Sequence, residues 1–187
     1  MPARLTPMPA ELAPKSIVLI GLSGAGKSEA GQLLARRLGA RLTDIDAEIE
    51  RRTGRTIPQI FEKDGEAVFR SLERDLMRDA LSAAPHVIVP GGGWAAQSGA
   101  LEQAAGRAVT VWLRVSPAVA ATRLAGTAGR PLVSATEAEA SLTQLLAVRE
   151  SSYATADTSL DTDTMTPAEV VEALARVAGE QAGWPDA

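Results

Sequence analysis

The segment from Gly21 to Ser28 constrains the fold of this chain more than any other feature of its sequence. It reads GLSGAGKS and matches the pattern G-x-x-x-x-G-K-[ST]. Glycines at this spacing allow successive backbone N–H groups to surround one anion, and a helix that starts here adds the positive end of its dipole. The pattern predicts a loop for the phosphates of a nucleoside triphosphate, in which Lys27 reaches the β- and γ-phosphates. The residues expected to line that loop are Gly24, Ala25, Gly26, Lys27, Ser28 and Glu29.

The rest of the chain alternates apolar, β-branched runs with helical patterns. Such alternation is typical of the α/β class, in which helices cover both faces of a parallel sheet. Helices are expected from about Lys27 to Leu38 and from Pro167 onward. The expected strands are Ser16 to Ile20, ARLTDID (40–46), HVIVP (86–90), AVTVWLRV (108–115) and Thr158 to Leu160.

Length and composition argue against several kinds of protein. The chain has 187 residues, enough for one compact domain, and no cysteine, so a disulfide framework and a thiolate metal site are excluded. A net charge of −4 without a basic stripe argues against nucleic acid as a partner. The apolar runs fall far short of the ~20 residues that span a bilayer, so we expect no membrane partner and a cytoplasmic location.

We expect three segments along the chain. Residues 1–14 contain four prolines and are interpreted as a flexible lead-in, residues 15–180 as a single domain, and residues 181–187 as a tail. Within the domain, the stretch AGTAGRPLVSATEAEA (125–140) interrupts the alternation of strands and helices with its glycines and proline. We interpret residues 125–137 as a lid, a surface loop that closes over a ligand.

Further motifs follow the phosphate loop in a fixed order. They are DID (44–46), IFEKDGEAVFRSLE (60–73), GGG (91–93), RPL (130–132) and RESSY (149–153). Together with the loop they make the chain resemble the shikimate kinases. The resemblance implies a three-layer P-loop kinase fold with five parallel strands in the order 2-3-1-4-5. It also implies ATP-dependent phosphorylation of shikimate to shikimate 3-phosphate, with Mg²⁺ as cofactor and with ATP and shikimate as small-molecule partners of a monomer.

Two aspartates, Asp44 and Asp46, close the expected second strand. They lie at its carboxyl end, where ligands of open α/β sheets bind. Two carboxylates that are two residues apart point the same way from an extended chain, so one can serve Mg²⁺ while the next meets the acceptor. The resemblance assigns Asp44, together with Ser28, to the metal. It assigns Asp46 to the acceptor hydroxyl, as the catalytic group that orients and deprotonates it.

The residues expected to hold the acceptor carry positive charge or lack a side chain. Arg70 and Glu73 are three residues apart on a helical pattern, so Glu73 can hold the guanidinium for a bidentate contact with a carboxylate. Shikimate has a carboxylate, and the resemblance gives Arg149 as its second arginine. The triplet Gly91, Gly92 and Gly93 follows an expected strand and allows close backbone approach to a ring-shaped polyol.

Two further arginines are expected on the nucleotide side. Arg130 lies in the expected lid, and its match to the lid arginine of shikimate kinases predicts a catalytic cation that reaches the transferred phosphoryl group. Arg123 resembles the arginine that stacks on adenine in that family. Both are therefore expected to bind ATP.

Two departures from the family pattern leave alternatives open. Glu29 stands where shikimate kinases usually have threonine, so we expect weaker nucleotide affinity. Trp94 follows the glycine triplet, where a small residue is usual, so a reshaped acceptor pocket is expected. One alternative is a kinase of another small hydroxy acid such as gluconate. A second is a catalytically inactive nucleotide-binding module, which would bind ATP and transfer nothing.

Overall fold

The computed structural model of the protein describes residues 13–125 and 135–185. Within them, five strands form one parallel sheet in the order β2-β3-β1-β4-β5. The strands are β1 (Ser16–Ile20), β2 (Leu42–Asp44), β3 (Val87–Val89), β4 (Ala108–Arg114) and β5 (Thr158–Asp161). The predicted α/β class and the predicted strand order are therefore confirmed.

Helices connect the strands and continue beyond the last one. They are α1 (Lys27–Arg37), α2 (Ile45–Thr53), α3 (Ile57–Asp64), α4 (Glu66–Ser82), the 3₁₀ turn η2 (Trp94–Ala96), α5 (Ala100–Ala104), α6 (Pro117–Ala125), α7 (Ala135–Tyr153) and α8 (Pro167–Ala182). Local sequence explains several of the helix starts. Thr166 caps α8 in a capping box with Glu169, and Pro167 occupies the first turn, where the missing N–H costs nothing.

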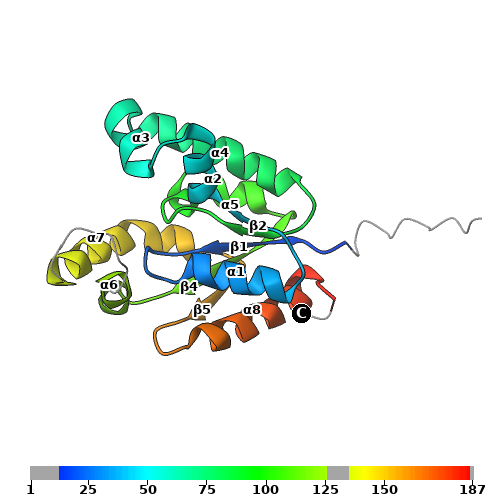
Figure 1. Ribbon diagram of the computed structural model, residues 1–187. Coiled ribbons are helices and arrows are strands. Elements are labelled where there is room, and N and C mark those ends of the chain that lie inside the picture. The colour runs from blue at the N-terminus through cyan, green and yellow to red at the C-terminus, as the bar shows by residue number, and fades with distance from the viewer. Residues whose placement is uncertain (1–12, 126–134, 186–187) are drawn as a thin grey trace, which may run out of the picture.

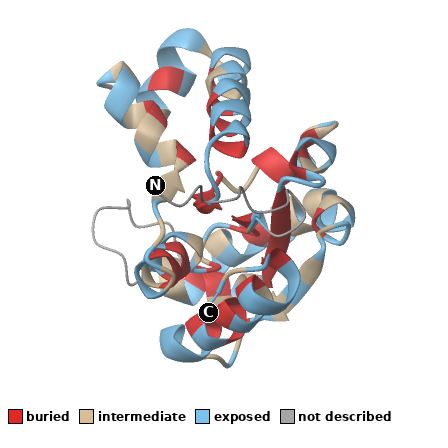
Figure 2. Cartoon of the chain, turned by 90° about the vertical axis from the view of Figure 1, so that its right-hand side faces the viewer, coloured by how far each residue is buried: buried red, intermediate tan, exposed pale blue. Residues whose placement is uncertain are grey.

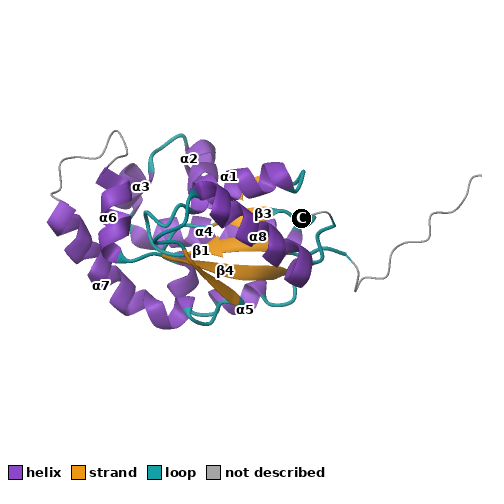
Figure 3. Cartoon of the chain, turned by 90° about the horizontal axis from the view of Figure 1, so that it is seen from below, coloured by secondary structure: helices purple, strands orange, loops and turns teal. Residues whose placement is uncertain are grey.

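The sheet is sandwiched between two helical layers (Figures 1 and 3). On one face lie α1 and α8, which pack against each other and against β1, β3 and β4. On the other face lie α5 and α7 (Figure 3), with α4 packed against α5 and α6 packed against α7. This division follows from right-handed crossovers, because the connections that step toward β2 and those that step toward β5 must cover opposite faces. No helix of the described residues is long and apolar enough to cross a membrane.

Buried side chains are concentrated on the sheet and on the helix faces that contact it (Figure 2). All five residues of β1 and all three of β3 are buried, as expected for central strands covered on both sides. The edge strand β2 is only half-buried. The last helix, α8, ends at Ala182, and beyond it the indole N–H of Trp184 donates to the carbonyl of Lys15 at 2.8 Å.

The parallel sheet places three strand ends at one edge of the molecule. The loop from Gly21 to Gly26 follows β1, Asp44 ends β2, and the glycine triplet comes soon after β3. These segments are far apart in the sequence, yet the paired register of β1, β2 and β3 brings them together. The edge is therefore where a ligand of an open α/β sheet is expected to bind.

Candidate active site

The phosphate loop connects β1 to α1 and packs tightly against β4 and α6. Gly24 has a φ of 82°, and a β-carbon there would lie 2.7 Å from the carbonyl oxygen of Ala120, so only glycine fits without strain. Gly26, with a φ of 81°, is the N-cap of α1. The helix therefore begins directly at Lys27 and directs its positive dipole end at the loop.

The ammonium group of Lys27 is already held inside this loop. Its Nζ atom donates to the carbonyl oxygens of Gly21 and Leu22, each at 2.9 Å. Burial lowers the pKa of Lys27 to about 8, although the nearby carboxylates of Asp46 and Asp44 act in the opposite direction. The side chain thus lies between the backbone of the loop and the two aspartates, a position from which it can contact a phosphate.

Ser28 and Asp44 meet where the loop faces the end of β2. The Ser28 hydroxyl donates to Oδ2 of Asp44 at 2.8 Å. A hydroxyl beside a carboxylate is the oxygen set that Mg²⁺ uses when phosphates and water supply its other ligands. Among the described residues, no three His, Cys, Asp or Glu side chains cluster to hold a metal by themselves. The pair therefore fits a nucleotide-bound magnesium ion.

The structure corrects the prediction that Asp44 and Asp46 project together from an extended strand. β2 ends at Asp44, and Asp46 lies in the first turn of α2. Asp44 is the N-cap of this helix, since its Oδ1 accepts from the N–H of Ala47 at 3.2 Å. The cap turns the chain, so the two carboxylates face different partners.

Asp46 is partly buried and has a free acceptor. No described group donates a hydrogen bond to its Oδ1 atom, which is shielded from solvent. Burial raises the pKa of Asp46 to about 6, and the negative charges of Glu73 and Asp44 add to this, whereas Lys27 and Arg70 lower it. A carboxylate with one unpartnered oxygen is suited to accept a hydrogen bond from a ligand hydroxyl.

Arg70 and Glu73 form the ion pair that the sequence predicts on α4. Nη1 of Arg70 donates to Oε2 of Glu73 at 2.7 Å, and Glu73 is fully buried. The exposed carboxylate of Glu66 accepts from Nε and Nη2 of Arg70 at 3.2 Å. Two carboxylates thus fix the orientation of this guanidinium.

The glycine triplet lies among these charged groups. A β-carbon at Gly91 would lie 2.8 Å from Oδ1 of Asp46, and one at Gly93 would lie 2.7 Å from Nη2 of Arg70. At Gly92 a β-carbon would lie 3.5 Å from Nη1 of Arg149 and 3.2 Å from the carbonyl oxygen of Gly21. The triplet therefore borders Asp46, the two arginines and the phosphate loop at once, and side chains there would fill the space between them.

Arg149 and Tyr153 reach the triplet from α7. Tyr153 is buried, and its hydroxyl donates to the carbonyl of Gly92. Burial raises the pKa of Tyr153, and the adjacent Arg149 partly offsets this effect. Tyr153 was not predicted as a site residue, although its spacing of four from Arg149 places both side chains on one helix face.

A small hollow beside the loop fits the nucleotide side of the site. It has a volume of about 120 Å³, and its lining includes Gly26, Glu29, Arg123 and Thr162. Arg123 donates to the carbonyl of Thr162 at 2.6 Å, which fixes its guanidinium at the wall of the hollow. The position suits contact with a base, as the sequence predicts for Arg123. Arg130 and residues 126–134 of the expected lid lie outside the described residues, and 135–137 begin α7.

Replacing Glu29 with threonine is expected to tighten ADP binding by about threefold to tenfold. Glu29 is exposed in the first turn of α1 and borders the hollow, so its charge opposes an incoming phosphate by roughly 1 kcal/mol at a short distance in water. Titration calorimetry of Glu29→Thr and Glu29→Gln against the wild type separates the added hydroxyl from the lost charge. Glu62→Gln, on exposed α3, is the matched control, and unchanged affinity in both Glu29 variants would contradict this position for the phosphate.

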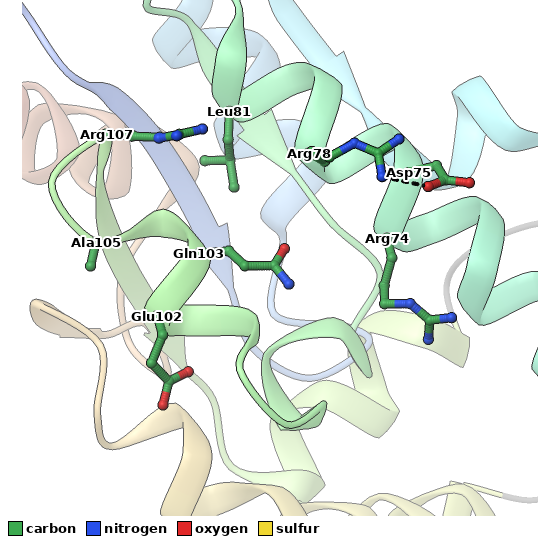
Figure 4. A pocket seen from close by; sticks show the side chains of 8 residues that line it. All are labelled: Arg74, Asp75, Arg78, Leu81, Glu102, Gln103, Ala105 and Arg107. Carbon is green, nitrogen blue, oxygen red and sulfur yellow. Dashed lines mark ion pairs between the residues drawn. The ribbon is translucent and has the colours of Figure 1, made fainter.

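A separate hollow contains none of the strand-end segments (Figure 4). It has a volume of about 490 Å³ and is formed by α4, α5 and the turn before β4. Arg78 is paired there with Asp75 at 2.9 Å, and none of the residues predicted for the phosphates or the acceptor contributes to it. We therefore assign the site to the strand-end edge.

The described fold and site define the class of protein. A parallel 2-3-1-4-5 sheet with a phosphate loop after β1, and with acidic and basic groups at the neighbouring strand ends, is the arrangement of a P-loop kinase.

Comparison with known proteins identifies the family. A sequence model described as shikimate kinase matches residues 23–178. A shikimate kinase of Bradyrhizobium diazoefficiens is 36% identical over 181 residues, covering 94% of this chain and 87% of that protein. One of Thermobifida fusca is 42% identical over 160 residues, covering 85% and 92%. A structure of shikimate kinase from Acinetobacter baumannii in complex with shikimate superposes with a TM-score of 0.81 at 32% identity, covering 91% and 97%. The chain belongs to the shikimate kinase family and is an ATP-using enzyme.

Proposed function

We propose that this kinase transfers the γ-phosphoryl group of ATP to the 3-hydroxyl of shikimate and releases ADP and shikimate 3-phosphate. One observation carries the proposal: a single glycine triplet borders Asp46, Arg70, Arg149 and the phosphate loop. A carboxylated polyol seated on the triplet would meet two cations at its acid group and one carboxylate at a hydroxyl. The phosphate loop on the other side of Gly92 would supply the nucleotide at contact distance.

In this reaction the residues of the chain position the acceptor, orient its hydroxyl and stabilise the transferred phosphoryl group. Asp46 accepts the proton of the attacking hydroxyl through its unpartnered Oδ1, while the oxygen forms its bond to the γ-phosphorus and the bond to the ADP oxygen breaks. Lys27 stabilises the negative charge on the transferred group. Arg70 and Arg149 hold the carboxylate of the acceptor, and Arg123 lies against the base.

Magnesium belongs to this scheme as a partner of the nucleotide. Ser28 and Asp44 would hold it, and the bound ion would neutralise charge on the β- and γ-phosphates. We also propose that Arg130 supplies a further cation to the transferred group from the segment after α6. We further propose that the enzyme acts as a monomer in the cytoplasm, since the site assigned here needs no residue from a second chain.

Replacing Arg70 with lysine is expected to raise the KM for shikimate by about 10- to 100-fold. Lysine keeps the charge but loses the planar fork, and hydrogen bonds to charged groups are worth about 1.5–3 kcal/mol. The KM for ATP should stay within about twofold, because Arg70 lies at the acceptor side against Gly93. Steady-state kinetics with each substrate varied in turn checks this. Equal rises in both KM values would place Arg70 outside the acceptor site.

The proposed reaction is tested by ADP release over a panel of acceptors. We expect turnover with shikimate at a kcat/KM at least about a hundredfold above that for gluconate. Gluconate is an open chain and lacks the ring that we propose to lie on the glycine triplet. Preferred turnover of gluconate would support the alternative kinase. Binding of ATP without transfer to any acceptor would support the inactive module. The presence of Asp46, Arg70 and Arg149 around one triplet, beside a loop that leads into Lys27 and Ser28, favours the active enzyme.

A further inference from the structure

Glu73, the buried partner of Arg70, has a second donor that comes from outside α4. Nε2 of Gln97 donates to Oε2 of Glu73 at 2.6 Å, and Nη1 of Arg70 donates to the same oxygen at 2.7 Å. Glu73 is fully buried, and no described group donates to its other oxygen, Oε1. An ionised carboxylate at such a place depends strongly on each hydrogen bond that it receives.

The backbone around Gln97 is fixed by the turn that follows the glycine triplet. Its N–H donates to the carbonyl of Trp94 at 2.9 Å and its carbonyl accepts from Ala100 at 3.1 Å. Trp94 is only 1% exposed and belongs to the hydrophobic core, so its indole anchors η2. The bulky residue after the triplet thus has a structural consequence: it holds the turn that presents Gln97 to Glu73.

The charged groups around Glu73 come from three helices. Arg70 on α4 and Arg149 on α7 lower the pKa of Glu73, whereas burial, the largest effect, raises it. Asp46 on α2 is a like charge, since Glu73 raises the pKa of Asp46. Gln97 supplies a donor without adding a positive charge, so it stabilises the ionised form of Glu73 and leaves both arginines available to a ligand.

We infer that Gln97 is a positioning residue for acceptor binding: its amide fixes Glu73, and Glu73 fixes the Arg70 fork that meets the acceptor carboxylate. This inference rests on the proposed function of Arg70. Without the amide, protonation of Glu73 leaves the exposed Glu66, which accepts from Nε and Nη2 at 3.2 Å, as the remaining charged partner of Arg70. The fork then loses the buried anchor that holds it beside the triplet.

The test replaces Gln97 with methionine, which has similar length and no donor. We expect the KM for shikimate to rise about tenfold, as for the loss of one hydrogen bond to a charged group, with kcat and the KM for ATP within about twofold. The ratio of wild-type to variant kcat/KM should increase as the pH is lowered. The reason is that a Glu73 carboxyl without its amide donor has a higher pKa and protonates first in the variant.

A second acceptor separates positioning from packing. With the methyl ester of shikimate, whose acid group is uncharged, wild type and Gln97→Met should differ by less than about twofold, since Arg70 no longer has a carboxylate to meet. Gln103→Leu, an exposed glutamine on α5, is the matched control. Circular dichroism melting checks folding, and Gln97→Ala serves if the methionine variant is unstable.

The outcomes separate this inference from the proposed function. Equal losses with acid and ester, a ratio that does not change with pH, or a matching rise in the KM for ATP would overturn the role of Gln97. A Gln97 variant with wild-type kinetics would overturn it as well, provided that the wild type phosphorylates shikimate. A wild type without shikimate turnover would instead overturn the proposed function.

Discussion

Replacing Asp46 with asparagine is expected to lower kcat with shikimate by about a hundredfold or more, the range in which loss of a general base falls. The amide keeps the shape of the side chain and cannot accept the hydroxyl proton. The KM for ATP should stay within about twofold, because the loop that holds the phosphates is unchanged. Coupled ADP release with each substrate varied in turn measures all three constants. A kcat within threefold of the wild type would exclude Asp46 as the base.

Folding of the Asp46→Asn variant is not expected to suffer. The pKa of Asp46 is raised, so the folded protein binds its proton more tightly than the unfolded chain does. The free energy of unfolding therefore decreases as the pH rises from about 4 to about 6, because the folded protein must give up this proton, and it stays lower above pH 6. A neutral amide does not ionise and so removes this destabilisation. The melting temperature at pH 7 should be equal or higher. Asp79→Asn, an exposed aspartate on α4, is the matched control for both measurements.

Replacing Lys27 with methionine is expected to lower kcat by about 10²- to 10³-fold, the effect of removing one preorganised donor from a developing negative charge. Methionine fills a similar volume, so the fall in kcat measures the contribution of the ammonium group. In the structure this group lies 2.9 Å from two carbonyl oxygens of the loop. Affinity for ADP should fall as well, which titration calorimetry measures. Lys63→Met, at the end of α3, is the matched control.

The Lys27 variant also separates an enzyme from an inactive nucleotide-binding module. Turnover by the wild type that disappears in Lys27→Met excludes the module, because only a catalytic site depends on this charge for transfer. A Lys27→Met variant that keeps more than a tenth of the wild-type kcat would contradict the role of Lys27 at the transferred group.

Local patterns were sufficient to predict the phosphate loop and the sheet. The spacing from Gly21 to Ser28 depends only on backbone geometry within one turn, and the buried runs of β1 and β4 need no knowledge of their neighbours. The strand order was available only through the resemblance, because pairing between distant segments leaves no periodic signal. Short-range physics thus determines the phosphate loop and the buried strands, but not the order of the strands in the sheet.

The position of Asp46 could not be derived from alternation alone. Asp44 ends the strand by accepting from the N–H of Ala47, and this hydrogen bond starts a helix one residue later. An aspartate at a strand end is also a good N-cap, so the sequence did indicate a helix start at Asp44. The interpretation of residues 40–46 as a strand assigned this aspartate to a ligand alone. The correction changes the direction of Asp46 and leaves it at the same edge of the sheet.

Gln97 had no local signal at all. Its amide meets Glu73 across 24 positions of sequence, and only the folded chain brings the two together. Glutamine in a turn is ordinarily a solvated side chain, so its partner could be found only in the structure. Tyr153 shares this property, since its hydrogen bond partner, the carbonyl of Gly92, lies 61 positions away.

The central claim is that the triplet site passes a phosphoryl group to a hydroxyl of shikimate, and phosphorus NMR of the products tests it most directly. Equal amounts of ATP and shikimate with the purified enzyme and magnesium should give ADP and one phosphomonoester, coupled to the ring proton at carbon 3, in a one-to-one ratio. ADP with inorganic phosphate and no phosphomonoester, or a phosphomonoester at another hydroxyl, would contradict the account.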